Sequence, residues 1–335
     1  MKPLIIFTEP EKSLLISEFK TIQHDPYENY EFFSKSISRL IETNRIPSFF
    51  LEICKTIAYE RNSGTSLIHV IRNCPIDDNL PDLDLEDPLS SKKKLKKTFI
   101  GECFLEAFNQ LMGTPLLAYG SRFGGNFFTD VIAIKKFKGQ MTGFSDSELV
   151  YHNDRTAHAV RADYISLLGL RCPTDDIVIT GFVDGKNLLK KLSLEDNNIL
   201  REHYFETHFD VYSKSTNSSQ QVSAPHAIIE NEYSIRYLDT LTKVRKDAPP
   251  EAKDALINFK NALTLIEKSR HRILTGDLLV FANQDGLHNR EKIEIINPEE
   301  TEKRWLLKTY AFKNFEVANN HSHLWLNNMF GRIAD

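Results

Sequence analysis

The sequence predicts an α+β protein with a mainly β core, a sandwich or barrel that helices wrap from both ends. Three observations predict this class. Residues 1–62 carry apolar side chains at helical spacing, residues 64–312 are mostly short β-rich runs separated by turn residues, and a helical insert interrupts them at about 240–272. No internal repeat or linker divides the 335 residues, so we expect one domain.

Helices are predicted through most of the first third. Phe33, Ile37 and Leu40 recur at helical spacing, and Pro47 stands where a first helical turn tolerates proline. We expect helices within residues 10–22, 27–42, 47–60 and 102–113. The lysine-rich residues 90–99 are interpreted as a solvated loop or helix start rather than a phosphate site.

Strands are predicted through the rest of the chain. We expect them at the start of residues 64–82 and within residues 115–120, 127–134, 147–152, 163–170, 176–182, 207–212, 226–231, 233–239, 276–283, 287–293 and 304–312. Residues 186–205 are expected to be helical. Residues 213–223 are rich in serine, asparagine and glutamine, which indicates a mobile loop of the kind that serves as an active-site lid.

Composition and charge narrow the class of protein. The chain is 41% hydrophobic and 26% charged with a net charge of -4, so it lacks the basic field that nucleic-acid binding needs. The four cysteines form no CxxC pair, which favours reduced, buried thiols of a cytoplasmic protein. No signal-peptide pattern and no apolar run of transmembrane length is present, so no membrane partner is expected. The oligomeric state is left open.

A His-x-Asp pair ends one of the predicted strands. His152 and Asp154 are two residues apart, and such side chains share one face of a strand, so both could reach a metal ion. An ordinary ion pair on a wet strand has the same spacing. His208 and Asp210 form a second such pair, as chance allows among 11 histidines. Spacing alone leaves either pair open as part of the 2-His-1-carboxylate triad of non-haem Fe(II) oxygenases.

Three further residues favour the first pair. His288 follows an apolar strand and a turn, which suits a distal histidine ligand. Arg304, sixteen residues later, begins another strand, and its guanidinium fork could hold a carboxylate through two hydrogen bonds. Thr180 offers a hydroxyl at a strand's end that could share the same carboxylate.

On these motifs the chain resembles the clavaminate synthase-like branch of the Fe(II)- and 2-oxoglutarate-dependent oxygenases, relatives of taurine dioxygenase that include hydroxylases of free amino acids. The resemblance covers residues 64–312. "GTSLIHVIRNCPIDDNLP" resembles the family's opening segment, and "SELVYHNDRTAHAVRADYISLLGLRC" its metal-binding strand. "GDLLVFANQDGLHNR" and "RWLLKTY" resemble its distal histidine and co-substrate arginine. The order of these motifs selects His152 over His208, and leaves His208 and Asp210 as a strand pair facing solvent or a lid.

The resemblance implies a fold, a metal site and a reaction. The fold is a double-stranded β-helix, or jelly roll, flanked by N-terminal and inserted helices. His152, Asp154 and His288 would bind Fe(II), and Arg304 with Thr180 would hold 2-oxoglutarate, with dioxygen as the other co-substrate. The reaction would hydroxylate an unactivated C–H bond of a free polar or basic amino acid, lysine- or arginine-like. His158 falls where the family has a histidine after the metal motif, and it would lie beside the metal ligands or be structural.

The substrate residues are less sharply marked. Lys308, four residues after Arg304 on the same strand face, could meet a substrate carboxylate or simply face solvent. Glu230, Glu232 and Asp239 could receive a basic side chain, although exposed carboxylates need no ligand. Two other functions stay open. One is a related oxygenase that desaturates or cyclises a carrier-bound or modified small molecule, and the other is a non-catalytic jelly-roll binding protein.

Overall fold

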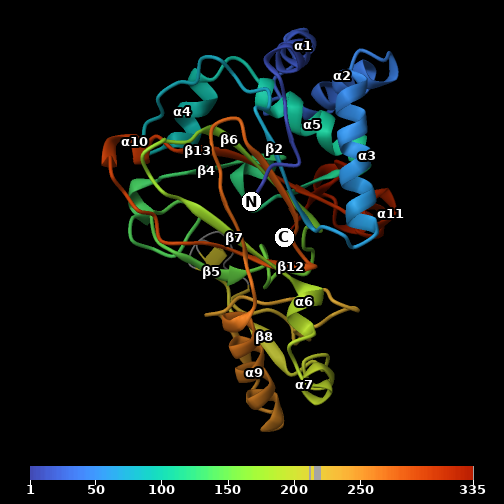
Figure 1. The fold of residues 1–335 in the computed structure, drawn as a ribbon, viewed down its shortest axis with the longest axis vertical. Helices are drawn as coiled ribbons and strands as arrows, with labels where there is room; N and C mark the ends of the chain where they lie inside the picture. The colour runs from blue at the N-terminus through green and yellow to red at the C-terminus, as the bar shows by residue number, and fades with distance from the viewer. Residues whose placement is uncertain (211–212, 215–219, 335) are drawn as a thin grey trace.

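Two β-sheets form the centre of the computed structural model, which describes residues 1–210, 213–214 and 220–334 (Figure 1). The larger, eight-stranded sheet contains β1 (Ile5–Ile6), β2 (Ile68–Arg72), β11 (Leu278–Ala282), β6 (Tyr164–Arg171), β13 (Trp305–Ala311), β3 (Leu116–Tyr119) and β14 (Arg332–Ile333) in this order, and β4 (Phe128–Ile132) also pairs with β13. The smaller sheet has the order β10 (Ser269–Arg272), β7 (Ile179–Asp184), β12 (Gly286–Arg290) and β5 (Leu149–His152). A separate ribbon pairs β8 (Phe205–Thr207) with β9 (Thr242–Val244).

The two sheets pack against each other through buried apolar side chains. Phe182 of β7 lies against Phe281 of β11, with ring centroids 5.9 Å apart, and Leu167 and Leu279 belong to the same buried cluster. Side chains alternate between the two faces of a strand, so one face of each sheet is available for this core. The predicted strand-rich core of an α+β protein is confirmed.

Helices cover the outer face of the larger sheet (Figure 1). They are α1 (Glu9–Phe19), α2 (Tyr30–Glu42), α3 (Ser48–Asn62) and α5 (Ile100–Met112). Phe104 of α5 shares a buried cluster with Leu168 of β6 and Val280 of β11. The Thr8 side chain accepts a hydrogen bond from the Glu11 backbone N–H, and the Glu11 carboxylate accepts one from Thr8, which fixes the start of α1. The predicted N-terminal helices are confirmed.

The lysine-rich residues 90–99 are less exposed than expected. Most of them lie in α4 (Pro88–Leu95) and directly after it. Lys96 is buried between Asp77 at 3.1 Å and Glu102 at 2.8 Å, and Lys92 lies 2.5 Å from Asp130. The stretch therefore forms most of helix α4 and the connection to α5 instead of a helix start or a solvated loop, and two of its lysines are bound to buried carboxylates.

A second group of helices lies beneath the smaller sheet, at the bottom of Figure 1. They are α6 (Gly185–Leu189), α7 (Leu194–Ile199) and α9 (Glu251–Leu265). Phe259 of α9 and Leu287 of β12 belong to their common core. Residues 186–205 hold two helices instead of one because Ser193 caps a new helix start by accepting a hydrogen bond from the Asp196 N–H. The helical insert predicted at 240–272 is only α9, because β9 and β10 flank it.

The strands predicted at 226–231 and 233–239 are not formed as ladders. Residues 229 and 235 make one isolated bridge, and Leu238 makes another with His152. The chain turns back between them, where the Glu230 N–H donates to the Ser234 carbonyl at 3.0 Å. Of the strand predicted at 207–212, only Thr207 belongs to an observed strand, because β8 ends at that residue. Residues 211–212 lie outside the described residues. So do residues 215–219 of the expected lid.

The remaining helices are short: α10 (Pro298–Glu302), α11 (Phe315–Asn320) and the 3-10 turns η1 (Phe123–Gly125), η2 (Lys135–Phe137), η3 (Ser322–Leu324) and η4 (Leu326–Asn328). None of the helices in the described part is long and apolar enough to span a bilayer. The four cysteines, Cys54, Cys74, Cys103 and Cys172, are buried free thiols, and burial raises the pKa of each.

Candidate metal centre and its cavity

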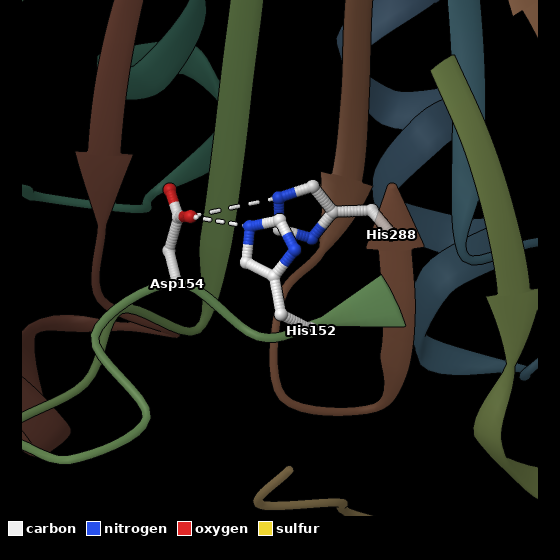
Figure 2. Close-up of side chains that lie close together, drawn as sticks. All are labelled: His152, Asp154 and His288. Carbon is white, nitrogen blue, oxygen red and sulfur yellow. Dashed lines mark hydrogen bonds and ion pairs between the residues drawn. The ribbon is translucent and has the colours of Figure 1, made fainter. Parts of the chain in front are cut away.

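Two histidines from neighbouring strands and an aspartate from the turn after one of them converge at the edge of the smaller sheet (Figure 2). His152 ends β5, Asp154 follows in the next turn, and His288 lies on β12. The register of β5 and β12 pairs His152 directly with His288, and their ring centroids are 4.3 Å apart. The predicted convergence of these three residues is confirmed by this geometry.

The three side chains offer a metal-binding set of donor atoms. One ligand atom from each lies within 4.8 Å of the other two. Asp154 Oδ1 is 3.2 Å from His152 Nε2 and 3.6 Å from His288 Nε2. His152 Nδ1 lies 2.7 Å from the Val150 carbonyl oxygen, and an N–H donated there leaves the Nε2 lone pair directed at the other ligands. Two imidazole nitrogens and one carboxylate oxygen suit non-haem Fe(II).

The protonation states of the cluster also suit a metal. Burial and the neighbouring His152 lower the pKa of His288 to about 4, so this imidazole is neutral at neutral pH. Burial would raise the pKa of the Asp154 carboxyl, but the Lys308 ammonium and hydrogen bonds from the two histidines hold it well below its usual range. Because metal ligands must be deprotonated, both residues are ready to bind.

Strand β13 holds the other carboxylate oxygen of Asp154. The Tyr310 hydroxyl donates to Oδ2 at 3.0 Å, and Lys308 forms an ion pair with the same oxygen. This leaves Oδ1 facing the two histidines. Lys308 lines the cavity and is largely buried, so the interpretation of it as a solvent-facing lysine is wrong. Sequence reasoning missed Tyr310, although it lies two residues after Lys308 on the same strand face.

Two asparagines fix the turn that carries Asp154, and sequence reasoning missed both. Asn153 is buried, and its amide nitrogen donates to the backbone carbonyl oxygens of Asn283 and Gly286 at 2.5 and 2.8 Å. Its side-chain oxygen accepts the Tyr237 N–H at 2.8 Å. Asn283 in turn accepts the Asp154 N–H at 2.8 Å. The only sequence signal was their position, one inside the His-x-Asp motif and the other before the turn to β12.

Arg304 and Thr180 line the same cavity as the triad. Arg304 is only 8% exposed, and its guanidinium forms no hydrogen bond or ion pair with the described residues, although the charge of Asp176 acts favourably on it. Burial lowers the pKa of this guanidinium. A buried charge without a partner is costly, so a cavity that contains one is suited to an anion. Thr180 is also buried, at the start of β7.

The second His-x-Asp pair lines this cavity as well. His208 and Asp210 are about one-third exposed, and neither belongs to the group of metal-ligand atoms among the described residues. Asp210 lies 3.6 Å from Arg122, and Arg155 lies over the Tyr119 ring with its guanidinium carbon 4.1 Å from the ring centroid. Sequence reasoning missed both arginines, although Arg155 directly follows Asp154.

His158 lines the cavity without joining the metal cluster. Its ring centroid is 4.7 Å from that of Phe209. Burial and the charges of Arg155 and Arg122 lower the pKa of His158 to about 2, so it is neutral. This position favours the structural role that was one of its two predicted roles.

The predicted acidic substrate residues do not line the cavity. Glu230 pairs with Arg161 and lies 3.4 Å from Arg236. Asp239 accepts a hydrogen bond from Tyr237 and lies 3.3 Å from Lys260. The charges of Glu230 and Asp239 are thus met by cations of the chain itself, and Glu232, the third acidic residue, is exposed. Nothing in their positions supports a role in receiving a basic side chain.

Comparison with solved structures identifies the fold. Asparagine oxygenase in complex with Fe(II), 2S,3S-3-hydroxyasparagine and succinate is similar to 97% of this chain and 98% of its own, with a TM-score of 0.79 and 16% identity. The non-haem iron oxygenase OrfP in complex with Fe and alpha-ketoglutaric acid matches over 99% of both chains, with a TM-score of 0.78 and 17% identity. OrfP in complex with Fe, succinate and (3S)-hydroxy-L-Arg matches over 100% of both, at a TM-score of 0.78 and 17% identity. No protein-family model and no curated protein sequence matches the chain.

Proposed function

We propose, from the premise that this chain has the fold of the non-haem iron oxygenases, that it is an Fe(II)- and 2-oxoglutarate-dependent dioxygenase hydroxylating an unactivated C–H bond of an amino acid. The observation that carries the proposal is the convergence of His152, Asp154 and His288 on a cavity that also contains the buried Arg304. The two packed sheets are then the double-stranded β-helix of such enzymes. The buried free thiols support a cytoplasmic location.

The residues of the cavity have distinct roles in this reaction. The triad would hold Fe(II) through two imidazole nitrogens and one carboxylate oxygen, and Arg304 with Thr180 would hold the distal carboxylate of 2-oxoglutarate. When bound, Fe(II) supplies the chemistry by which 2-oxoglutarate and dioxygen become succinate and carbon dioxide and one oxygen atom enters the substrate C–H bond. Tyr310 and Lys308 keep the Asp154 carboxylate in place by holding Oδ2.

The substrate is proposed to be a free polar or basic amino acid. The cavity presents charges of both signs, as a zwitterion requires, because Lys308 and Arg122 can meet a carboxylate and Asp210 an ammonium or guanidinium group. The complexes of the two similar oxygenases with hydroxylated asparagine and hydroxylated arginine support this class. Glu230 and Asp239 have no part in it, because they do not line the cavity.

Succinate release tests the proposal. The purified protein is given Fe(II), ascorbate, 2-oxoglutarate and, in turn, each of the twenty common amino acids. We expect stimulation by a polar or basic amino acid, with a product heavier by one oxygen atom. Slow release without stimulation would move the search to carrier-bound or modified substrates. A protein that takes up no iron and releases no succinate would contradict the oxygenase assignment.

Thr180→Val is expected to raise the KM for 2-oxoglutarate by roughly two- to tenfold with little change in kcat, because one hydroxyl hydrogen bond contributes about 0.5–1.5 kcal/mol. Valine keeps the shape of the side chain and replaces the hydroxyl with a methyl group, which forms no hydrogen bond. Steady-state succinate release at varied 2-oxoglutarate measures both constants. Thr174→Val, at an exposed position nearby, is the matched control. An unchanged KM in Thr180→Val would remove Thr180 from the co-substrate site.

A further inference from the structure

Arg290 is a buried arginine that forms no ion pair with a carboxylate among the residues that the structure describes. It lies two residues after His288 on β12 and is 6% exposed. Its guanidinium donates instead to four backbone carbonyl oxygens, those of Ser147 at 2.6 Å, Ser145 at 2.7 Å, Thr142 at 3.2 Å and Gly143 at 3.4 Å. An arginine is able to make such a fan of bonds because its five N–H donors lie in one plane.

The carbonyls belong to residues 142–147, which lead directly into β5 and so to His152. This segment has no strand or helix of its own. Buried carbonyl groups outside regular structure must find donors elsewhere, and Arg290 supplies them. Beyond Arg290, the Ile134 N–H donates to the Phe144 carbonyl at 3.0 Å, and the Phe144 ring packs against Phe137. Arg290 is thus the main polar link between this segment and β12.

Arg290 also shares the cavity wall with Arg304. Residues 143 and 144 line this wall together with the two arginines. The two guanidinium charges repel each other, and neither forms an ion pair with a carboxylate of the described residues, although the charge of Asp146 favours that of Arg290 and the charge of Asp176 favours that of Arg304. In a site shielded from water such charges act more strongly than at the surface. An anion bound between the segment and Arg304 would relieve the repulsion, and a second negative charge on it would relieve more.

We propose that Arg290 is a positioning residue for the co-substrate: it fastens residues 142–147 to β12 beside Arg304, forms one wall of the 2-oxoglutarate site and favours a dianion there. This inference rests on the proposed function. It differs from the role of Arg304, which would touch the carboxylate itself. It predicts that loss of Arg290 frees the segment and weakens 2-oxoglutarate binding while the metal ligands stay in place.

Arg290→Met and Arg290→Lys test the inference, with Lys292→Met, an exposed position two residues after the end of β12, as control. Three quantities are measured on each protein: iron affinity, the affinity of the anaerobic Fe(II) protein for 2-oxoglutarate, and the rate of tryptic cleavage after the exposed Lys138. We expect Arg290→Met to bind 2-oxoglutarate more than about tenfold more weakly. Iron affinity should change little, and cleavage after Lys138 should be faster.

The lysine variant separates position from charge. An ammonium keeps the charge but is a single nitrogen without the planar fork, so it cannot reproduce the bonds that Nη1 and Nη2 of Arg290 make together. Arg290→Lys should therefore also be cleaved faster and bind 2-oxoglutarate more weakly than the wild type. Wild-type binding in Arg290→Lys would overturn the positioning role. The affinity ratio of 2-oxoglutarate to 2-oxopentanoate, which lacks the distal carboxylate, should fall in Arg290→Met, and an unchanged ratio would overturn the preference for a dianion.

The same measurements distinguish failure of this inference from failure of the proposed function. If the wild-type protein binds neither iron nor 2-oxoglutarate, the proposed function fails. If the wild type binds both and Arg290→Met binds both equally well, only the inference fails. Loss of iron binding in Arg290→Met would also contradict it, because Arg290 would then support the metal site instead of the co-substrate site.

Discussion

Asp154→Ala is expected to abolish succinate release and to weaken iron binding by more than about 100-fold, beyond the loss typical of residues that merely support metal ligands. Asp154 supplies the anionic donor of the triad, and without it two neutral imidazoles remain. Iron affinity is measured by equilibrium dialysis and turnover by succinate release. The exposed Asp175→Ala is the control and should retain both properties.

A second variant distinguishes loss of the metal ligand from loss of the fold. Asp154→Ala leaves the buried Lys308 ammonium without its carboxylate, and breaking a buried ion pair costs about 3–5 kcal/mol. Asp154→Ala/Lys308→Met removes both charges and should unfold close to the wild-type temperature while still failing to bind iron. Asp210→Ala should alter substrate affinity and leave iron bound. Iron loss in Asp210→Ala together with retention in Asp154→Ala would move the metal site to His208.

The periodicity of apolar residues predicts most elements of this fold. It fails where apolar residues are buried but their backbone does not pair with a neighbouring strand. The helix α2 and the strands β11 and β13 were predictable because their apolar spacing matches their environment. Residues 226–239 have the same β-rich composition, but Ile229, Ile235 and Tyr237 are buried in the core beneath the smaller sheet. There the Tyr237 N–H is satisfied by the Asn153 side chain. Strand propensity describes a half-buried surface and does not specify the partner of the backbone.

In the candidate site, too, the residues predictable from local spacing differ from those whose contacts depend on how distant strands are arranged. His152 and Asp154 are predictable because a strand places residues i and i+2 on one face, and the order of later motifs identifies His288. The contact of Lys308 with Asp154 depends instead on which strands the fold brings together, and no local pattern contains that. For the same reason Asn153 was not recognised as the residue that ties the metal turn to the rest of the sheet.

Arg304→Met is expected to raise the KM for 2-oxoglutarate by more than about 100-fold without a change in iron affinity, because the bidentate, charge-assisted hydrogen bonds to the distal carboxylate are lost. The same variant should be more stable than the wild type when no ligand is present. The wild-type guanidinium is buried without an ion pair to any residue of the described chain, and methionine fills similar space without a charge. We expect the unfolding temperature of the ligand-free protein to rise by about 2–4 °C.

Unfolding temperatures measured with and without 2-oxoglutarate report both effects of Arg304→Met, the weaker co-substrate binding and the higher stability of the ligand-free protein. The wild-type Fe(II) protein should gain about 2.7 kcal/mol of stability at a hundredfold excess over Kd, because the ligand binds only the folded state, and Arg304→Met should gain almost nothing. Arg304→Lys should fall between them, since an ammonium offers no planar fork. The exposed Lys303→Met should behave as the wild type. A ligand-free Arg304→Met protein that is less stable but keeps its full response to 2-oxoglutarate would show that Arg304 supports the fold and that another residue holds the co-substrate.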